Sequence, residues 1–112
     1  MNTQLNYLYR DGCNYKVYNT CVIEGEMTDA LFERIRASLY EDEYFAPDIV
    51  GLPGETMVDL GYAFDPEIDN NLFEFCDEAF VLTHKAADVH CKVKDLVNKF
   101  EQCKGKWLTK NI

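Results

Sequence analysis

Residues 5–23 contain two runs rich in aromatic and β-branched residues, and a short polar break divides them. The break, residues 10–14, contains Asp11-Gly12, a dipeptide typical of tight hairpin turns. We therefore predict that the chain opens with a β-hairpin. By the strand period of two, one face of the second strand is mostly apolar and should cover the core. That face consists of Tyr15, Val17, Asn19, Cys21 and Ile23.

The spacing of apolar residues then changes to that of a helix. Apolar side chains recur at helical spacing between residues 31 and 39. Thr28 can cap such a helix, and Asp29 suits the positive end of its dipole. These residues predict a first helix over residues 28–40.

The helical spacing returns near the C-terminus. One apolar stripe steps by four and three residues along Val89, Val93, Leu96, Phe100 and Cys103. It predicts a second helix that begins between residues 88 and 93 and ends at Gly105. We expect Trp107, just beyond this helix, to pack back on the core.

Residues 41–55, EDEYFAPDIVGLPGE, follow the first helix. Pro47 disfavours a helical conformation at Ala46, and Gly51, Pro53 and Gly54 indicate a turn. We interpret the stretch as a packed crossover. The side chains expected under the helix are Tyr44, Phe45, Ile49, Val50 and Leu52. Its exposed rim should consist of Glu41, Asp42 and Glu43.

Two later segments have the composition of strands. Residues 56–64 are a candidate weakened by Gly61, and residues 71–83 are a stronger one. The pair Asp77-Glu78 either turns the latter into a hairpin or lies within one long bulged strand. The order of elements predicts an α+β fold in a single compact domain, residues 1–112. It would contain the N-terminal β-hairpin, an antiparallel sheet of three to four strands, and two helices packed on one side.

The charge is distributed unevenly along the chain. The net charge is −9, but residues 24–78 hold sixteen acids against Arg34 and Arg36, a balance of −14. Residues 79–112 carry seven lysines against three acids, a balance of +4. The middle of the chain should repel nucleic acid and anionic membranes, and attract a basic partner over about one Debye length, roughly 8 Å. The alternative is that these acids only keep the protein soluble.

The location of the protein is predicted from what the sequence lacks. It shows neither a secretory signal nor an apolar run of about 18 residues, the length that a membrane-spanning helix needs. We therefore expect a cytoplasmic protein without a membrane partner. Its five cysteines are odd in number and form no Cys-x-x-Cys pair, so we expect free thiols.

Candidate catalytic and metal-binding residues form no recognisable pattern. His90 and Cys91 are neighbours, so their side chains point in different directions, which does not favour a Cys-His pair. The cysteine and histidine spacings match no compact zinc pattern, and residues 65–76 resemble a calcium loop without its turn glycine and closing glutamate. We predict no enzyme activity, cofactor or metal. The alternative is a small enzyme or metal-binding protein that uses His84, His90 and carboxylates.

Several short blocks form a wider pattern: RDGCNYK at 10–16, EYFAP at 43–47, VGLP at 50–53, and FEF at 73–75 after an Asp/Asn-rich segment. This pattern resembles a family of small uncharacterised bacterial, plasmid and phage proteins with the motifs YRDxxNYK and EYFxPxxVGLP. The chain departs from that family at Asn70-Asn71-Leu72, where the family has a bulkier His/Trp pair. The resemblance implies no known enzymatic role. It implies cargo of mobile elements, among which small acidic proteins often block host nucleases.

The leading hypothesis is a non-enzymatic interaction module or inhibitor. Its acidic residues would occupy a basic surface of a nucleic-acid-handling protein, for example the nucleic-acid-binding groove of a nuclease such as a CRISPR effector, and it would not bind nucleic acid itself. The alternative is a housekeeping interaction domain with no electrostatic role. No oligomeric state is predicted. The predicted partner-binding residues are Glu41, Asp42, Glu43, Asp65, Glu67, Asp69, Glu74, Asp77 and Glu78.

Overall fold

The computed structural model describes residues 1–108 and has an α+β architecture, as predicted. Its single sheet is antiparallel and contains β1 (Asn2–Arg10), β2 (Lys16–Ile23), β3 (Tyr44–Phe45) and β4 (Phe73–Thr83). The strands lie in the order β2-β1-β4-β3, so the N-terminal hairpin is extended by β4, and the short β3 lies at one edge.

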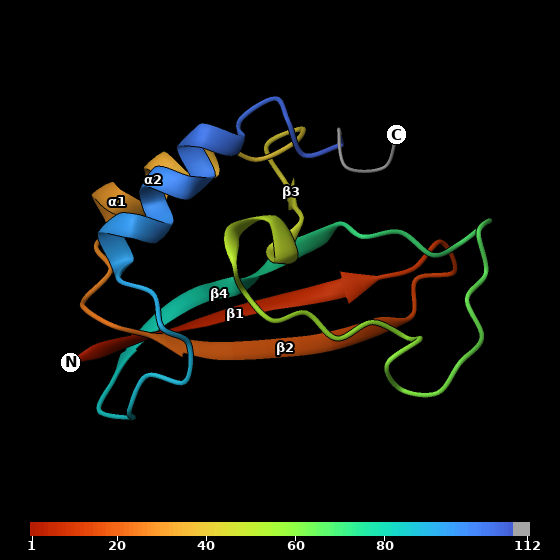
Figure 1. Ribbon diagram of the computed structural model, residues 1–112, viewed down its shortest axis with the longest axis horizontal. Helices are drawn as coiled ribbons and strands as arrows, with labels where there is room; N and C mark the ends of the chain where they lie inside the picture. The colour runs from red at the N-terminus through yellow and green to blue at the C-terminus, as the bar shows by residue number, and fades with distance from the viewer. Residues whose placement is uncertain (109–112) are drawn as a thin grey trace.

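Two helices, α1 (Asp29–Arg36) and α2 (Val93–Cys103), lie side by side over one face of the sheet (Figure 1). This arrangement confirms the prediction of two helices on one side. Arg34 of α1 and Glu101 of α2 form an ion pair of 2.6 Å that joins the helices at the surface. The predicted domain also included residues 109–112, which lie outside the described residues.

The turn between β1 and β2 confirms the predicted hairpin, and Asp11 holds it. Asp11 Oδ1 accepts hydrogen bonds from the backbone nitrogens of Cys13 at 2.8 Å and Tyr15 at 2.9 Å. Asn14 has a φ of 68°, a left-handed conformation that asparagine tolerates better than most residues. The predicted core position of Tyr15 is wrong, because β2 begins one residue later and Tyr15 lies exposed in the turn.

The other predicted core positions of β2 are buried or, for Asn19, half-buried. Val22 is buried as well, although it lies on the opposite face. The segment before α2 covers it, since Val22 O accepts hydrogen bonds from the backbone nitrogens of Asp88 at 3.0 Å and Val89 at 3.2 Å. The strand period of two therefore predicted which face of β2 covers the core, but it did not predict that the segment before α2 would bury Val22 on the other face.

β4 is one long strand, which decides between the two predicted alternatives. Leu5 of β1 lies opposite Phe80, whereas Tyr7 lies opposite Phe75. Residues 76–79 therefore face the single β1 residue between these two positions, as in an enlarged β-bulge. The acidic pair of β4 lies in this bulge rather than in a hairpin turn.

The prediction of a strand at residues 56–64 is wrong, because this segment forms consecutive turns. The backbone nitrogen of Leu60 donates to Met57 O at 3.1 Å, and that of Gly61 donates to Val58 O at 3.0 Å. Gly61 has a φ of 98°, a left-handed conformation that interrupts an extended chain. Local turn hydrogen bonds satisfy the backbone here in place of a strand ladder.

Helix α1 begins where predicted and ends four residues early. The backbone nitrogen of Leu31 donates to the capping Thr28 Oγ1 at 3.2 Å. After Arg36 the chain forms turns, and Ser38 Oγ donates to the carbonyl of Arg34 at 2.8 Å. Serine bonding of this kind offers the backbone an alternative to continued helix.

Helix α2 begins at Val93, the later of the predicted starts. The backbone nitrogen of Val93 donates to Glu24 O at 2.9 Å, which ties the start of α2 to the end of β2. Gly105 follows the helix with a φ of 78°, as expected for a terminating glycine. Neither helix in the described part of the chain has the length and apolarity needed to cross a membrane.

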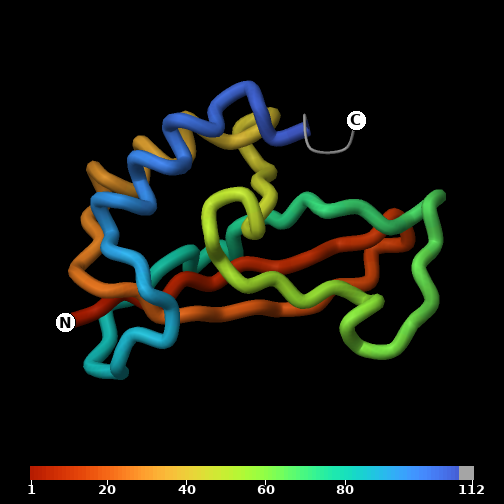
Figure 2. The backbone as a smooth tube through the Cα atoms, viewed as in Figure 1, coloured from red at the N-terminus to blue at the C-terminus, as the bar shows by residue number. Residues whose placement is uncertain are grey.

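The crossover, residues 41–55, passes from the helical layer to the sheet, as the yellow part of the chain shows in Figure 2. Its Phe45 ring stacks on Phe75 of β4 with a centroid distance of 4.6 Å and meets Phe100 of α2 at 5.4 Å. Trp107 closes this aromatic core, as predicted, and its Nε1 donates to Ser38 O at 2.7 Å. The crossover is thus part of the core.

A second connection, residues 56–70, extends to the far end of the molecule and lies beside the β1–β2 turn (Figure 1). We call it the 56–70 loop. It is held at both ends: Asn19 exchanges side-chain hydrogen bonds with the backbone of Glu55 at 2.8 and 3.1 Å, and Gly12 N donates to Ile68 O at 2.7 Å. The turn and the loop therefore form one end of the molecule.

Candidate functional site

The nine predicted partner-binding carboxylates lie in three groups. Glu41, Asp42 and Glu43 form the turn between α1 and β3, and Glu74 lies opposite Tyr44 in the adjoining strands. The second group is the acidic pair of the β4 bulge, Asp77 and Glu78. The third is in the 56–70 loop and consists of Asp65, Glu67 and Asp69.

The turn before β3 presents its three acids to solvent. Glu41 and Asp42 have φ values of 52° and 59°, and the turn is closed by hydrogen bonds from the backbone nitrogens of Glu43 at 3.0 Å and Tyr44 at 2.9 Å to Tyr40 O. Burial and then the nearby carboxylates, first that of Glu43, raise the pKa of Tyr44. The exposed rim of the crossover therefore has the position that was predicted for it.

Glu74 differs from the other carboxylates because its charge is engaged within the molecule. Its side chain is 13% exposed and accepts two hydrogen bonds from Arg10, from Nη2 at 2.7 Å and from Nε at 3.3 Å. Asn14 also accepts a hydrogen bond from this guanidinium. A bidentate contact of this kind positions Arg10. It also neutralises the Glu74 carboxylate within the molecule, so Glu74 should contribute little to the attraction of a partner.

The bulge of β4 faces α1 across a shallow hollow of about 390 Å³. Asp77 and Glu78 are both exposed there. The one cation that lines this hollow is Arg36. Its Cζ atom lies 4.9 Å from the centre of the Phe32 ring, and its Nε lies 3.6 Å from Glu33 Oε1. Acids thus outnumber cations along this side of β4.

The acids of the 56–70 loop hold a local turn. Asp65 N donates to Asp69 Oδ2 at 2.8 Å, Glu67 N donates to Asp65 Oδ1 at 3.0 Å, and Tyr9 OH donates to Asp69 Oδ1 at 2.6 Å. The Tyr9 hydrogen bond lowers the pKa of Asp69, whereas burial and then that bond raise the pKa of Tyr9 to about 12. The calcium-like spacing is therefore used for turn closure, and residues 1–108 contain no group of three His, Cys, Asp or Glu side chains that could hold a metal ion.

The thiols and imidazoles are dispersed. All five cysteines are free, and burial raises the pKa of Cys21 to about 11 and the pKa values of Cys76, Cys91 and Cys103 in the same direction. A raised pKa keeps these thiols protonated and poorly nucleophilic near neutral pH. His84 and His90 are exposed in the segment between β4 and α2.

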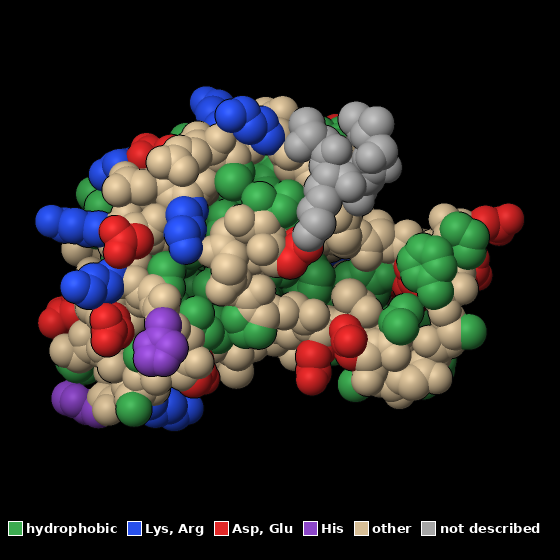
Figure 3. Space-filling view, in the orientation of Figure 1, with side chains coloured by type: hydrophobic (Ala, Val, Ile, Leu, Met, Phe, Trp, Pro, Cys, Tyr) green, Lys and Arg blue, Asp and Glu red, His purple; other side chains and the backbone are tan. Residues whose placement is uncertain are grey.

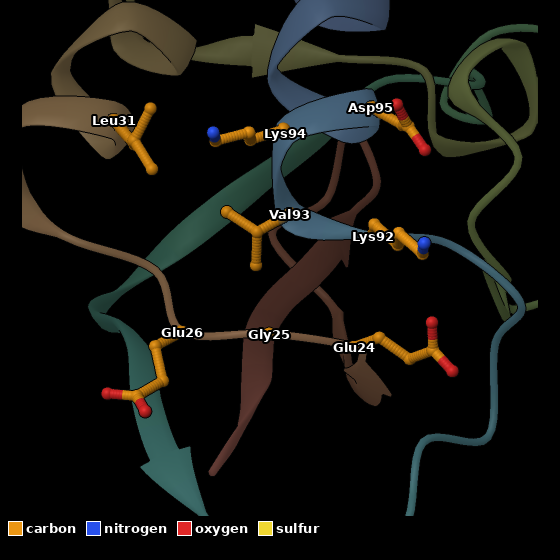
Figure 4. Close-up of a pocket in the computed structure, with 8 residues that line it drawn as sticks. All are labelled: Glu24, Gly25, Glu26, Leu31, Lys92, Val93, Lys94 and Asp95. Carbon is orange, nitrogen blue, oxygen red and sulfur yellow. The ribbon is translucent and has the colours of Figure 1, made fainter.

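A hollow of about 540 Å³ lies where β2 ends and α2 begins, and sequence reasoning did not identify it. Figure 4 shows the carboxylates of Glu24 and Glu26 on either side of Gly25, and Lys92 and Lys94 directed to opposite sides of the α2 N-terminus. Because its walls carry both signs of charge, this hollow favours neither an anion nor a cation.

Cationic side chains are segregated on the face of the molecule shown in Figure 3. Lysine and arginine side chains lie with acidic ones on the part that contains α2, whereas the far end, formed by the 56–70 loop and the adjoining turn, shows acidic and apolar side chains. The apolar side chains were missed as surface residues by the sequence analysis, which placed Tyr15 in the core and Tyr62 and Phe64 in a strand. The glycine and proline near them were the signals for an exposed loop.

A scan against protein-family models and searches of curated proteins and of solved structures found no match for this chain.

Proposed function

We propose that this chain is a non-enzymatic, cytoplasmic interaction module that inhibits a nucleic-acid-handling protein by occupying its basic binding surface. The observation that supports this best is the placement of the acids of residues 24–78. Exposed members of this set lie in the turn before β3, in the β4 bulge and in the 56–70 loop, while α2 and its flanks carry most of the lysines.

The proposed mechanism is electrostatic competition. A nucleic-acid-binding surface carries lysines and arginines that contact phosphates, and exposed carboxylates are attracted to the same cations. Charges at the rim of such an interface mainly increase the association rate and fix the register of binding. The resemblance to proteins of mobile elements makes a host nuclease, such as a CRISPR effector, the expected partner.

The inhibitor hypothesis is tested by competition with the partner's own ligand. The immobilised chain is used to capture proteins from nuclease-treated lysate of the source organism, and each captured protein is purified and bound to labelled nucleic acid. Fluorescence anisotropy then measures release of that nucleic acid as the chain is added.

We expect release that weakens as salt is raised, and a weaker effect of the triple variant Glu41→Gln/Asp42→Asn/Glu43→Gln. A captured protein that keeps its nucleic acid at saturating concentrations of the chain would contradict the proposed function. A triple variant that competes as well as the wild type at low and high salt would remove residues 41–43 from the interface.

A further inference from the structure

A hollow of about 340 Å³ lies at the far end of the molecule, where the β1–β2 turn meets the 56–70 loop. Its apolar walls include Tyr15 from the turn and Met57, Tyr62 and Ile68 from the loop. Both tyrosines are largely exposed. Aromatic side chains that line an open hollow present ring faces to a ligand at little conformational cost.

The same hollow is lined by three carboxylates, those of Asp11, Asp65 and Asp69. The ion pairs formed within residues 1–108 join other acids, namely Glu26, Glu33, Glu74 and Glu101. No cation of the described chain is therefore paired with the carboxylates of this hollow.

Asp11 is the most informative of the three because it is only 6% exposed. Both hydrogen bonds that its side chain accepts end on Oδ1. No fully buried side-chain oxygen in the described residues lacks a hydrogen-bond partner, so Oδ2 reaches solvent. Asp11 lines this hollow and also a neighbouring one that contains Arg10 and Glu74. Together with Asp65 and Asp69, this carboxylate adds negative potential to the hollow, which favours a cationic ligand.

The walls of the hollow are fixed before any ligand arrives. The turn and the loop are joined by the hydrogen bond from Gly12 N to Ile68 O, and a Cβ atom at Gly12 would lie 3.1 Å from Ile68 Cα. The Tyr9 hydroxyl also donates a hydrogen bond of 2.6 Å to Asp69 Oδ1, which holds this carboxylate in place. A site whose groups are already positioned loses less free energy on binding than one that must first be ordered.

We propose that this hollow binds the guanidinium group of an arginine side chain on a basic protein partner. A planar guanidinium can bond to carboxylates with two nitrogens at once and can stack on tyrosine rings. The hollow offers both kinds of contact, three carboxylates and two exposed tyrosines, and its charge complements the ligand. The proposal rests on the proposed function in one respect, which is that the partner carries exposed arginines.

The test is an NMR titration of the ¹⁵N-labelled chain with N-acetyl-arginine amide. N-acetyl-citrulline amide, which has nearly the same shape without the charge, and N-acetyl-lysine amide are titrated in parallel. We expect saturable shifts of backbone amides in residues 11–15 and 62–69 with the arginine compound, at a Kd on the order of 1 mM for one isolated side chain. Lysine amide should bind several-fold more weakly and citrulline amide should give no saturable shift.

Two substitutions on the rim of the hollow and one matched control sharpen the test. Tyr62→Ala and Asp65→Asn should each weaken arginine binding several-fold, and both positions are exposed enough for the fold to persist. Tyr18→Ala removes a similarly exposed tyrosine from β2 and should leave the affinity unchanged. Each variant is first compared with the wild type by its amide spectrum.

Equal binding of citrulline and arginine amides, shifts centred outside the hollow, or an unchanged affinity in Tyr62→Ala would overturn the arginine site. Lysine amide binding as tightly as arginine amide would overturn the guanidinium preference. Failure of this site is separable from failure of the proposed function. Without arginine binding, competition with a partner's nucleic acid can still be observed, and with arginine binding, that competition can still be absent.

Discussion

The crossover and the 56–70 loop are adjacent in sequence and similar in composition, since both combine aromatic residues, acids, glycine and proline. Their aromatic side chains have opposite surroundings. Phe45 is fully buried, whereas Phe64 is 64% exposed. The difference arises from what covers each segment: the crossover lies between the helices and the sheet, and the loop extends past the ends of the strands (Figure 1).

This contrast separates two kinds of role. The crossover contributes rings to the core and presents an acidic rim, Glu41, Asp42 and Glu43, to a partner. The 56–70 loop contributes little to the core and presents apolar and acidic side chains together. Substitutions of the buried rings of the crossover should therefore affect stability, and substitutions of its acidic rim or of the 56–70 loop should affect binding.

The largest expected effect is that of Phe45→Ala. Because Phe45 stacks on Phe75 and is fully buried, its truncation should lower the free energy of unfolding by about 3–5 kcal/mol. Urea unfolding followed by fluorescence measures the change. Phe64→Ala is the control and should leave the unfolding midpoint nearly unchanged. A stable Phe45→Ala variant that no longer bound its partner would make Phe45 an exposed anchor and would reverse the comparison.

A smaller effect is expected where the crossover meets the sheet. The buried Tyr7 hydroxyl donates a hydrogen bond to Pro53 O at the end of the crossover. Tyr7→Phe removes this bond and should cost about 1 kcal/mol. Tyr18→Phe, on an exposed tyrosine of β2, is the matched control in the same unfolding measurement. Equal midpoints for the two variants would show that the bond does not secure the crossover.

The link between the sheet and the 56–70 loop should be sensitive to alkaline pH. The pKa of Tyr9 is raised from 10.0 to about 12 by burial and by its hydrogen bond to Asp69. The unfolded chain therefore loses this proton first, so stability should be fully present below pH 10 and should fall as the pH rises toward 12.

The measurement for Tyr9 is the unfolding free energy at several alkaline pH values in the wild type and in Tyr9→Phe. The variant should lose less stability over this range. Some loss should remain, because burial also raises the pKa of Tyr7. Identical pH profiles would show that Tyr9 does not couple the loop to the sheet.

The sequence predicted those elements whose signals are local. Asp11-Gly12 marked the hairpin, Thr28 marked the start of α1, and one apolar stripe marked α2. Residues 56–64 were mistaken for a strand because of their composition. A strand-like composition forms a strand only if a neighbouring strand is available for pairing, and this depends on the fold of the whole chain.

The candidate site was predictable only in part. The acids of residues 41–43 were expected at an exposed rim, and the structure places them there. The engagement of Glu74 by Arg10 depends on the register between β1 and β4, which no local pattern encodes. The hollow beside Asp11 likewise requires a turn and a loop more than forty residues apart to meet.

The smallest expected change concerns stability, and the same variant gives the most direct test of the proposed function. Glu41→Gln/Asp42→Asn/Glu43→Gln should unfold at nearly the wild-type temperature, because these side chains are exposed. Stopped-flow measurement of its association with the captured partner, from low to high salt, tests the claim that this acidic surface guides binding. We expect a steep fall in the wild-type rate with salt, and a slower variant at low salt whose rate converges with that of the wild type at high salt. Equal association rates for the wild type and the variant at every salt concentration would contradict the claim that this acidic surface guides binding.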